Sequence, residues 1–272
     1  MENEKIIYKS PLNFTGAKDQ QMLGLSYFFP KDVDTFYDVF AGGLSVTIIS
    51  DYQKIVANDI ITPMIEFYKE MQELNLEDFL YNVKAFAIPK DSPEDYAIAR
   101  ELFNKESNPY LFFALVSSCT NNMMRFNKKL KFNQTFGKRT INDNTIFKLT
   151  NYHKEINKKN ITFTSLPYRE FLTKQVFSKN DFVYLDPPYL ITEAGYNAYW
   201  SMEDERMLYY MLEMLNEQGI RFIMSNVSEH NGKVNPFLHR LTGFEIIEVP
   251  FEYEKVARKK GKGTKEIIVK NF

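Results

Sequence analysis

The sequence is poor in the residues that build cross-links and metal sites, with one cysteine and three histidines among its 272 residues. The single cysteine, Cys119, excludes an intrachain disulfide framework and a zinc site made of several cysteines. The three histidines are scattered along the chain without the spacing of metal ligands. We therefore expect no metal site and no Ser-His-Asp or Cys-His catalytic arrangement.

The chain also lacks a long apolar run and a strong charge of one sign. No stretch is long enough to span a bilayer, and residues 1–5 show no signal-peptide pattern, so we expect a cytoplasmic protein. Hydrophobic residues make up 44% and charged residues 25%, which is typical of a soluble globular protein of one or two domains. Because the net charge is −1, any nucleic-acid site must be a local patch.

One stretch, residues 181–189, organises the rest of the chain. Its apolar run 182–185 predicts a strand that is buried on both faces. Two prolines follow Asp186, and the strand ends there because proline cannot donate a ladder hydrogen bond. Ligands of open α/β sheets bind at the carboxyl edge of the strands, so we expect Asp186 and Tyr189 at a ligand-binding edge.

Methylation of an exocyclic amine is the chemistry that fits these groups. The nitrogen of such an amine is conjugated with its ring and is a poor nucleophile. The Asp186 carboxylate and a backbone carbonyl, held in place by Pro187 and Pro188, can each accept an N–H bond and aim the lone pair at an electrophile. The Tyr189 ring can stack on the base. An ordinary strand-to-loop turn, in which Pro and Asp are common, is the alternative.

A strand, a glycine turn and a helix are predicted for residues 35–46. Gly42 and Gly43 allow close approach of a ligand to the backbone, without the pattern of dinucleotide or phosphate loops. Asp59 ends the next strand, where a carboxylate can accept hydrogen bonds from ribose hydroxyls. Together these features favour a nucleoside cofactor; for Asp59 alone, a helix cap is the alternative.

A loop-to-helix junction near the start of the chain adds a second set of candidate ligand contacts. Phe14, Gly16 and Lys18 supply a ring, a turn and a cation that can bind an anionic or zwitterionic ligand. The alternative is a solvated lysine near a helix start.

The middle of the chain changes in character. Residues 60–110 follow a helical pattern, and core packing explains apolar positions such as Tyr68. Residues 121–160 hold ten basic and two acidic side chains, a net charge of +8, with few signs of apolar periodicity. Basic side chains neutralise phosphates, and Arg, Asn and Gln can read base edges. This predicts a small domain or ordered loop that contacts nucleic acid, against a solvated lysine-rich face.

The last third of the chain predicts further strands around the central one. In a doubly wound sheet, a strand at 162–166 places Phe163 to Leu166 near the base of a nucleoside cofactor. Residues 190–200 form an aromatic loop whose rings can cover a flipped-out base or merely pack the loop. The remaining elements are a helix capped by Ser201 that ends near Gly219, a strand at 220–226, and an antiparallel pair at 244–249 and 266–269.

Several of these motifs occur together in a known order. They lie at 14–18, 38–46, 57–60, 136–142 and 186–189, with Arg125 between them. In these residues the sequence resembles the Dam family of DNA adenine-N6 methyltransferases, in its α arrangement, and most closely the T-even bacteriophage Dam proteins. The likeness covers nearly the whole chain, and it adds the expectation of a host cytoplasm if the gene is phage-encoded.

The resemblance implies S-adenosylmethionine as methyl donor and a flipped-out adenine in GATC of double-stranded DNA as target. The catalytic residues that it implies are Asp186, Pro187, Pro188 and Tyr189, with Tyr189 stacked on the adenine. The cofactor-binding residues are Phe14, Lys18, Asp38, Phe40, Gly42, Gly43, Asp59, Phe163 and Asp186. The DNA-binding residues are Asn121, Met123, Arg125, Asn127, Thr135, Lys138 and Arg139.

The resemblance also implies a Rossmann-like, doubly wound mixed sheet of the class I methyltransferase kind, with an inserted small, mainly helical DNA-recognition domain. We expect residues 1–60 and 160–272 to form the catalytic, cofactor-binding domain and residues 61–159 the target-recognition domain. DNA is the expected partner, with no membrane and no obligate protein partner. Two rivals remain, an RNA or protein glutamine methyltransferase and a methyltransferase-fold DNA-binding protein without catalysis.

Overall fold

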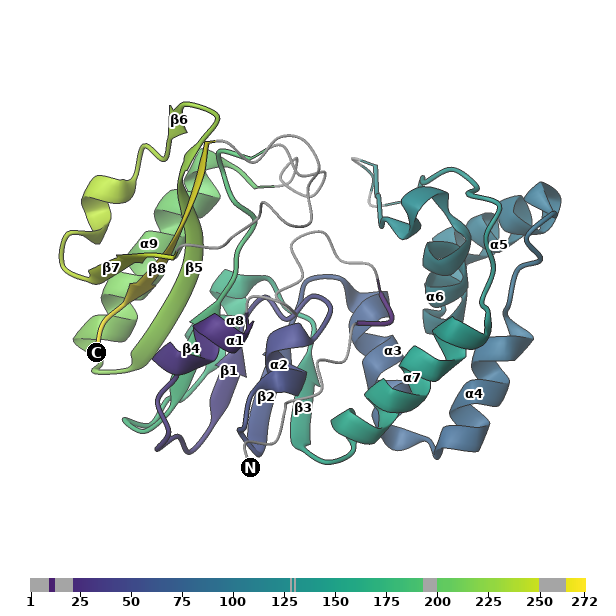
Figure 1. Cartoon of the computed structure of the whole chain (residues 1–272), viewed down its shortest axis with the longest axis horizontal. Helices are drawn as coiled ribbons and strands as arrows, with labels where there is room; N and C mark the ends of the chain where they lie inside the picture. Colours follow the sequence, from purple (N-terminus) through teal and green to yellow (C-terminus); the bar gives the residue numbers. More distant parts are fainter. Residues whose placement is uncertain (1–9, 13–21, 128, 130, 193–199, 250–262) are drawn as a thin grey trace. The chain divides into compact units, whose positions relative to one another are not determined.

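The computed structural model describes residues 10–12, 22–127, 129, 131–192, 200–249 and 263–272 (Figure 1). The chain forms two compact units. Unit 1 comprises Met1–Leu23 and Ala41–Ser165, and unit 2 comprises Gly24–Phe40 and Leu166–Phe272. These two units are defined by how compactly the chain is packed. The predicted division by function, into a catalytic domain at 1–60 and 160–272 and a target-recognition domain at 61–159, stays a prediction.

Unit 2 is built on a mixed sheet. Strands β1, β4 and β5 run parallel to one another, and β8 is antiparallel to both β5 and β7. Within the unit the order is β1-β4-β5-β8-β7, with β6 paired to β5. The bounds are β1 Phe36–Asp38, β4 Phe182–Leu185, β5 Arg221–His230, β6 Lys233–Val234, β7 Glu245–Glu248 and β8 Thr264–Lys270. The predicted mixed α/β class and the antiparallel terminal pair are confirmed.

The predicted central strand is β4, and its four residues are fully buried. The Phe182 ring stacks on Phe36 of β1 at 5.5 Å between centroids. Just before the strand, the buried Asp181 accepts hydrogen bonds from the backbone N–H of Thr35 at 3.1 Å and of Ser178 at 2.8 Å. The strand ends at Leu185, directly before Asp186 and the two prolines, as the loss of ladder donors predicts.

The longest helix described in unit 2 has the expected N-terminal cap. α9 (Met202–Glu217) begins with a reciprocal capping box, in which Ser201 Oγ accepts from the Asp204 N–H and Asp204 Oδ2 accepts from the Ser201 N–H. It ends before Gly219, whose φ of 72° is left-handed. The other helical segments are α8 Tyr168–Lys174 and the 3₁₀ turns η1 Ser26–Phe28 and η4 Leu238–Leu241. α1 is Met22–Leu25, and its last two residues belong to unit 2.

Unit 1 joins a pair of parallel strands to a set of helices. β2 (Lys54–Asn58) pairs with β3 (Asn160–Thr164) from Lys54↔Asn160 to Asn58↔Thr164. The helices are α2 Ser45–Ile49, α3 Thr62–Glu73, α4 Leu76–Ala85, α5 Pro93–Glu106, α6 Pro109–Ser118 and α7 Asp143–Ile156, with a 3₁₀ turn η2 at Thr120–Asn122.

The core of the helical set is α6, which contacts α3, α4 and α5. Asn108 caps it by accepting hydrogen bonds from the N–H groups of Tyr110 and Leu111, and Pro109 takes the first helical position. Every residue from 110 to 118 is buried, as its apolar sequence predicts. Phe113 stacks on Phe67 of α3 at 4.6 Å and 4°.

Two elements differ from the prediction. α7 was not predicted as a helix, and it occupies the end of the basic stretch, where little apolar periodicity was expected. It buries Leu149, Tyr152 and Ile156, which are spaced three and four residues apart and form one narrow face. β5 extends past residue 226 to His230, because β8 continues to pair with it beyond an irregularity at Val227/Glu229. Among the residues that the structure describes, no helix is both long and apolar enough to cross a membrane.

Candidate functional site

The Gly42–Gly43 turn of unit 1 links the sheet to α2. Gly42 has a φ of 46°, in the left-handed region that glycine adopts without steric cost. Leu44 follows with a φ of 60°, which is uncommon for a branched residue, and its side chain is fully buried. The Ala41 N–H donates to the carbonyl of Asn58 at 2.8 Å, and the Leu44 N–H to the carbonyl of Ala41 at 2.8 Å. The turn is thus a tight, defined structure.

Three side chains from other elements bind the backbone of this turn. Asp59 Oδ2, at the end of β2, accepts a hydrogen bond from the Gly42 N–H at 3.0 Å. The Tyr68 hydroxyl of α3 donates to the Gly42 carbonyl at 3.1 Å. The Tyr152 hydroxyl of α7 donates to the Gly43 carbonyl at 3.0 Å. The sequence assigned Tyr68 to core packing alone and gave no sign of Tyr152, since nothing in a local pattern shows where a hydroxyl ends up.

Asp59 lies half-buried beside the turn, and burial raises the pKa of its carboxyl above the ordinary value. Its second oxygen, Oδ1, accepts from the Ile61 N–H at 3.0 Å, just before α3. The side chain therefore supports both the helix start and the turn. Each carboxylate oxygen can accept more than one hydrogen bond, so the group can still accept from a ligand hydroxyl.

The other residues assigned to the cofactor lie in different surroundings. Asp38 is buried at the end of β1, and Phe40 is half-buried with its ring 5.6 Å from that of Tyr168 and 5.9 Å from that of Trp200. In unit 1, Phe163 of β3 stacks on the ring of Tyr68 at 6.0 Å. Phe14 and Lys18 lie outside the residues that the structure describes.

The Asp-Pro-Pro-Tyr segment follows β4 in unit 2. Asp186 and Tyr189 are half-buried, and the Tyr189 hydroxyl donates to Asp186 Oδ1 at 2.7 Å. Burial and the charge of Asp186 raise the pKa of Tyr189 well above its usual value, so its hydroxyl remains a donor. Pro187 is buried. The segment therefore presents a carboxylate whose orientation is set by its own tyrosine and by a stiff backbone.

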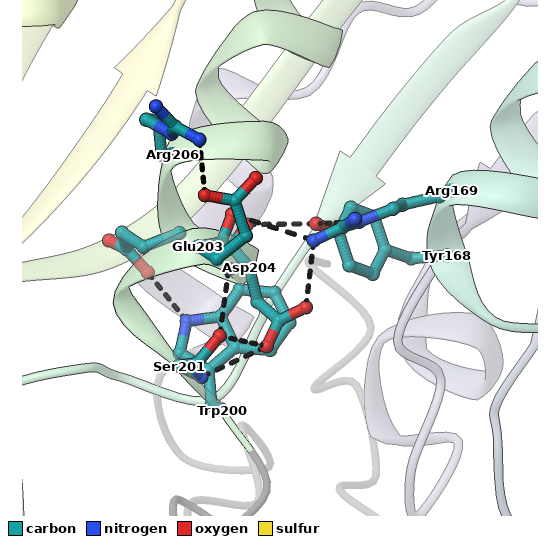
Figure 2. A network of polar contacts seen from close by, with 8 residues as sticks. Tyr168, Arg169, Trp200, Ser201, Glu203, Asp204 and Arg206 are labelled. Carbon is teal, nitrogen blue, oxygen red and sulfur yellow. Dashed lines mark hydrogen bonds and ion pairs between the residues drawn. The ribbon is translucent and has the colours of Figure 1, made fainter.

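Trp200, two residues before α9, is held by polar and ring contacts (Figure 2). The indole N–H donates to Glu205 Oε2 at 2.7 Å, and the ring lies 5.4 Å from Tyr168. Arg169 bonds both the Tyr168 hydroxyl, at 3.1 Å, and Asp204 Oδ1, at 2.9 Å, as Figure 2 shows. These contacts pack the Trp200 side chain against unit 2. Tyr196 and Tyr199 lie outside the described residues.

Glu205 itself is a fully buried carboxylate of α9. Besides Trp200 it accepts hydrogen bonds from the Tyr209 hydroxyl at 2.8 Å and from Nδ2 of Asn226 and Asn235 at 2.9 Å each. The described residues thus supply four donors, all of them neutral. Nothing in the local sequence indicates this role for Glu205.

The basic stretch of unit 1 begins as a hairpin at residues 119–137. Antiparallel bridges join Cys119 to Phe136 and Phe126 to Phe132. The hairpin is fixed to α5, because the Tyr96 hydroxyl donates to the Gln134 carbonyl at 2.9 Å and the Phe132 N–H donates to Asn104 Oδ1 at 2.8 Å. The predicted ordered loop is therefore a two-stranded element supported by a helix.

Most residues assigned to DNA contact are exposed on this hairpin or directly after it. Met123 and Asn127 are half-buried, and Asn127 Oδ1 accepts hydrogen bonds from the N–H groups of Lys129 and Lys131. The exposed ones are Asn121, Arg125, Thr135, Lys138 and Arg139. Asn121 and Lys138 have left-handed φ values of 59° and 54°.

Both arginines are held by asparagines that the sequence did not single out. Arg125 donates through Nε to Asn133 Oδ1 at 3.1 Å and through a terminal nitrogen to the Asn133 carbonyl at 2.8 Å. Arg139 donates to Asn122 Oδ1 at 2.5 Å. Asn122 in turn donates to the carbonyls of residues 116 and 117, at the end of α6. The guanidinium groups are thereby oriented before any ligand binds.

No group of three or more His, Cys, Asp or Glu side chains suited to a metal ion occurs among the described residues.

Comparison of the sequence with known proteins shows the family to which the chain belongs. Residues 14–254 match the family described as D12 class N6 adenine-specific DNA methyltransferase. The chain is 31% identical to the modification methylase StsI of Streptococcus sanguinis over 100% of the chain and 44% of that protein. It is 29% identical to the type II methyltransferase M.FokI of Planomicrobium okeanokoites over 97% of the chain and 43% of that protein.

A DNA adenine methylase of Serratia marcescens is 28% identical over 71% of the chain and 74% of that protein. The chain thus spans less than half the length of StsI and M.FokI. The predicted family of DNA adenine-N6 methyltransferases is confirmed. The predicted high similarity to T-even phage Dam proteins finds no support in these relatives. The chain belongs to the D12 class of N6 adenine-specific DNA methyltransferases.

Proposed function

We propose that the protein is a site-specific adenine-N6 DNA methyltransferase that uses S-adenosylmethionine and acts on a flipped-out adenine of double-stranded DNA, with GATC as target. The observation that carries the proposal is the Asp186–Tyr189 segment at the end of β4, with its carboxylate oriented by the Tyr189 hydroxyl at 2.7 Å. Membership of the D12 class supports the reaction type. The GATC target rests on the resemblance to Dam enzymes.

The residues of the Gly42–Gly43 turn fit a nucleoside-containing cofactor. The left-handed Gly42 has no side chain to obstruct a ligand, and the half-buried Asp59 keeps acceptor capacity for ribose hydroxyls. Phe40 offers a ring, and by the resemblance Asp38, Phe163, Phe14 and Lys18 complete the set. When bound, S-adenosylmethionine would supply the methyl group of its sulfonium and leave as the neutral thioether, and the proton that the amine loses would pass to water.

The role of the Asp186–Tyr189 segment is to hold the target amine. The Asp186 carboxylate and the Pro187 carbonyl each accept one N–H of the adenine amine, which localises the nitrogen lone pair. Tyr189 stacks on the extruded base, and extrusion costs a few kcal/mol because pairing and stacking are lost. Positioning and oriented dipoles then supply most of the catalysis.

The hairpin at 119–137 and the residues that follow it are the proposed DNA-recognition surface. Arg125 and Arg139 carry planar guanidinium groups that can bind a guanine edge with two hydrogen bonds. Lys138 and the other exposed lysines of the stretch neutralise phosphates. The asparagine contacts to both arginines support this assignment, because an oriented side chain loses less entropy on binding.

The test is methyl transfer from labelled S-adenosylmethionine to duplex DNA with and without GATC, followed by sequencing of the methylated positions. Asp186→Ala is expected to lower turnover by at least about a hundredfold while leaving cofactor and DNA binding measurable. Asp91→Ala, at an exposed loop position before α5, is the control and should behave as wild type. Near-wild-type turnover of Asp186→Ala would refute the catalytic assignment.

The same assay separates the rivals. A DNA-binding protein without catalysis would bind the duplex and transfer nothing, and an RNA or protein methyltransferase would label those substrates instead. Methylation at adenines outside GATC would retain the enzyme class and replace the target.

A further inference from the structure

The backbone of the Gly42–Gly43 turn is fixed at three successive peptide groups. Asp59 binds the Gly42 N–H, Tyr68 binds the Gly42 carbonyl and Tyr152 binds the Gly43 carbonyl, all at 3.0–3.1 Å. In a planar trans peptide the carbonyl and the following N–H point to opposite sides. A hydroxyl on the Gly42 carbonyl therefore also sets the direction of the Gly43 N–H.

The conformation that these bonds hold is one that the chain does not favour by itself. Leu44, directly after the glycines, has a φ of 60° and a ψ of 18°. A non-glycine residue in this region is strained and persists where its surroundings over-determine it. The two tyrosine hydroxyls supply part of that constraint, from positions 26 and 109 residues further along the chain.

Both tyrosines are suited to this task. Their side chains are fully buried, Tyr68 on α3 and Tyr152 on α7. Burial raises the pKa of Tyr68 well above its usual value, so its hydroxyl keeps its proton and stays a donor throughout the neutral range. The ring of Tyr68 also stacks on Phe163, at 6.0 Å, so the position of its hydroxyl is defined from two sides.

We propose that Tyr68 and Tyr152 are positioning residues for the methyl donor, acting through the carbonyls of Gly42 and Gly43. The inference rests on the proposed function, which assigns this turn to S-adenosylmethionine. Neither tyrosine needs to touch the donor. Their hydroxyls hold the turn in its binding conformation before the donor binds. Binding the donor therefore costs less conformational entropy.

The test is donor affinity measured directly, by isothermal titration calorimetry with S-adenosylmethionine and with its thioether product, in the full chain. Tyr68→Phe and Tyr152→Phe each remove one hydroxyl and keep the ring. Each is expected to weaken donor binding about three- to tenfold, with turnover at saturating donor and affinity for DNA within about twofold of wild type. Tyr96→Phe removes a buried hydroxyl that binds Gln134 instead, and it should leave donor affinity unchanged.

A purely structural role gives a different result. In that case the melting temperature falls in both variants while donor affinity stays at the wild-type value, and the inference is overturned. Weaker donor binding in Tyr96→Phe to the same degree would overturn it as well. Because binding is measured without turnover, the inference stands if the variants bind the donor weakly and the wild type methylates no DNA, an outcome that would remove only the proposed function. Wild-type protein that does not bind the donor would remove both.

Discussion

Gly137 lies directly against the backbone of Cys119 and Thr120 in the basic hairpin, and replacing it with alanine is a direct test of the recognition surface. A Cβ at this position would lie 2.3 Å from the Cys119 carbonyl oxygen, 2.4 Å from its carbon and 2.7 Å from the Thr120 nitrogen. All three are backbone atoms, so no side chain can rotate away. Reaching an ordinary contact of 3.4 Å requires a backbone displacement of about 1.1 Å.

A displacement of that size separates the base of the hairpin. It breaks the bond from the Gly137 N–H to the Ser118 carbonyl and the bond from the Thr120 N–H to the Thr135 carbonyl, both 2.9 Å long. Two such bonds contribute about 1–3 kcal/mol, and crowding adds about 1–3 kcal/mol, so the local cost is about 2–6 kcal/mol. Arg139, two residues further on, would lose its position beside Asn122.

We therefore expect Gly137→Ala to weaken duplex binding at least tenfold in fluorescence anisotropy and to speed amide hydrogen exchange in residues 118–139. Affinity for S-adenosylmethionine should remain at the wild-type value. Gly243→Ala is the matched control, because a Cβ there meets no atom within 4 Å and its backbone is not left-handed. Wild-type DNA affinity and unchanged exchange in Gly137→Ala would refute the argument from the hairpin.

Arg139→Ala should reduce discrimination at one base pair by about 1–3 kcal/mol, seen by comparing affinities for single-substitution duplexes; equal losses on all sequences would make Arg139 a phosphate contact instead. Donor affinity should fall as the pH drops through the raised pKa of Asp59, because the protonated carboxyl loses charge and acceptor capacity; calorimetry across pH, with Asp59→Asn as a flat reference, checks this. When the pKa of a carboxyl rises on folding, the carboxyl contributes stability to the fold below its unfolded pKa, and this contribution is lost as the pH rises. Asp59 therefore does not promote acid unfolding, and acid unfolding through Asp59 cannot cause the loss of donor affinity at low pH. Glu205→Gln should lower the free energy of unfolding by about 1–3 kcal/mol in urea, since its amide places a donor where four donors already converge; an unchanged midpoint contradicts that reading.

Strong local patterns in the sequence were enough to predict the central elements. The apolar run before two prolines predicted β4 and its end to within one residue, and Ser201 predicted the start of α9. The glycine turn and the strand that ends just before Asp59 also follow directly from turn and strand propensities. Each of these signals is contained in fewer than a dozen residues.

Other features depend on contacts between residues far apart in the chain, and a local sequence pattern contains no information about such contacts. α7 was missed because only a narrow face of it is apolar, within a stretch dominated by lysine and asparagine. The tyrosine contacts to the turn, and the asparagines behind Arg125 and Arg139, depend on where hydroxyl and amide groups lie after packing. The roles of the individual site residues remain predictions that the experiments above address.

Trp200 is the only tryptophan in the chain. Its indole is fixed by the bond to Glu205 and lies against the rings of Phe40 and Tyr168. Intrinsic emission excited at wavelengths where tyrosine no longer absorbs therefore comes from a single environment instead of an average over several. Unlabelled protein thus carries an optical probe at the end of the loop that follows Asp186–Tyr189, and stopped-flow mixing can time events there without any attached dye.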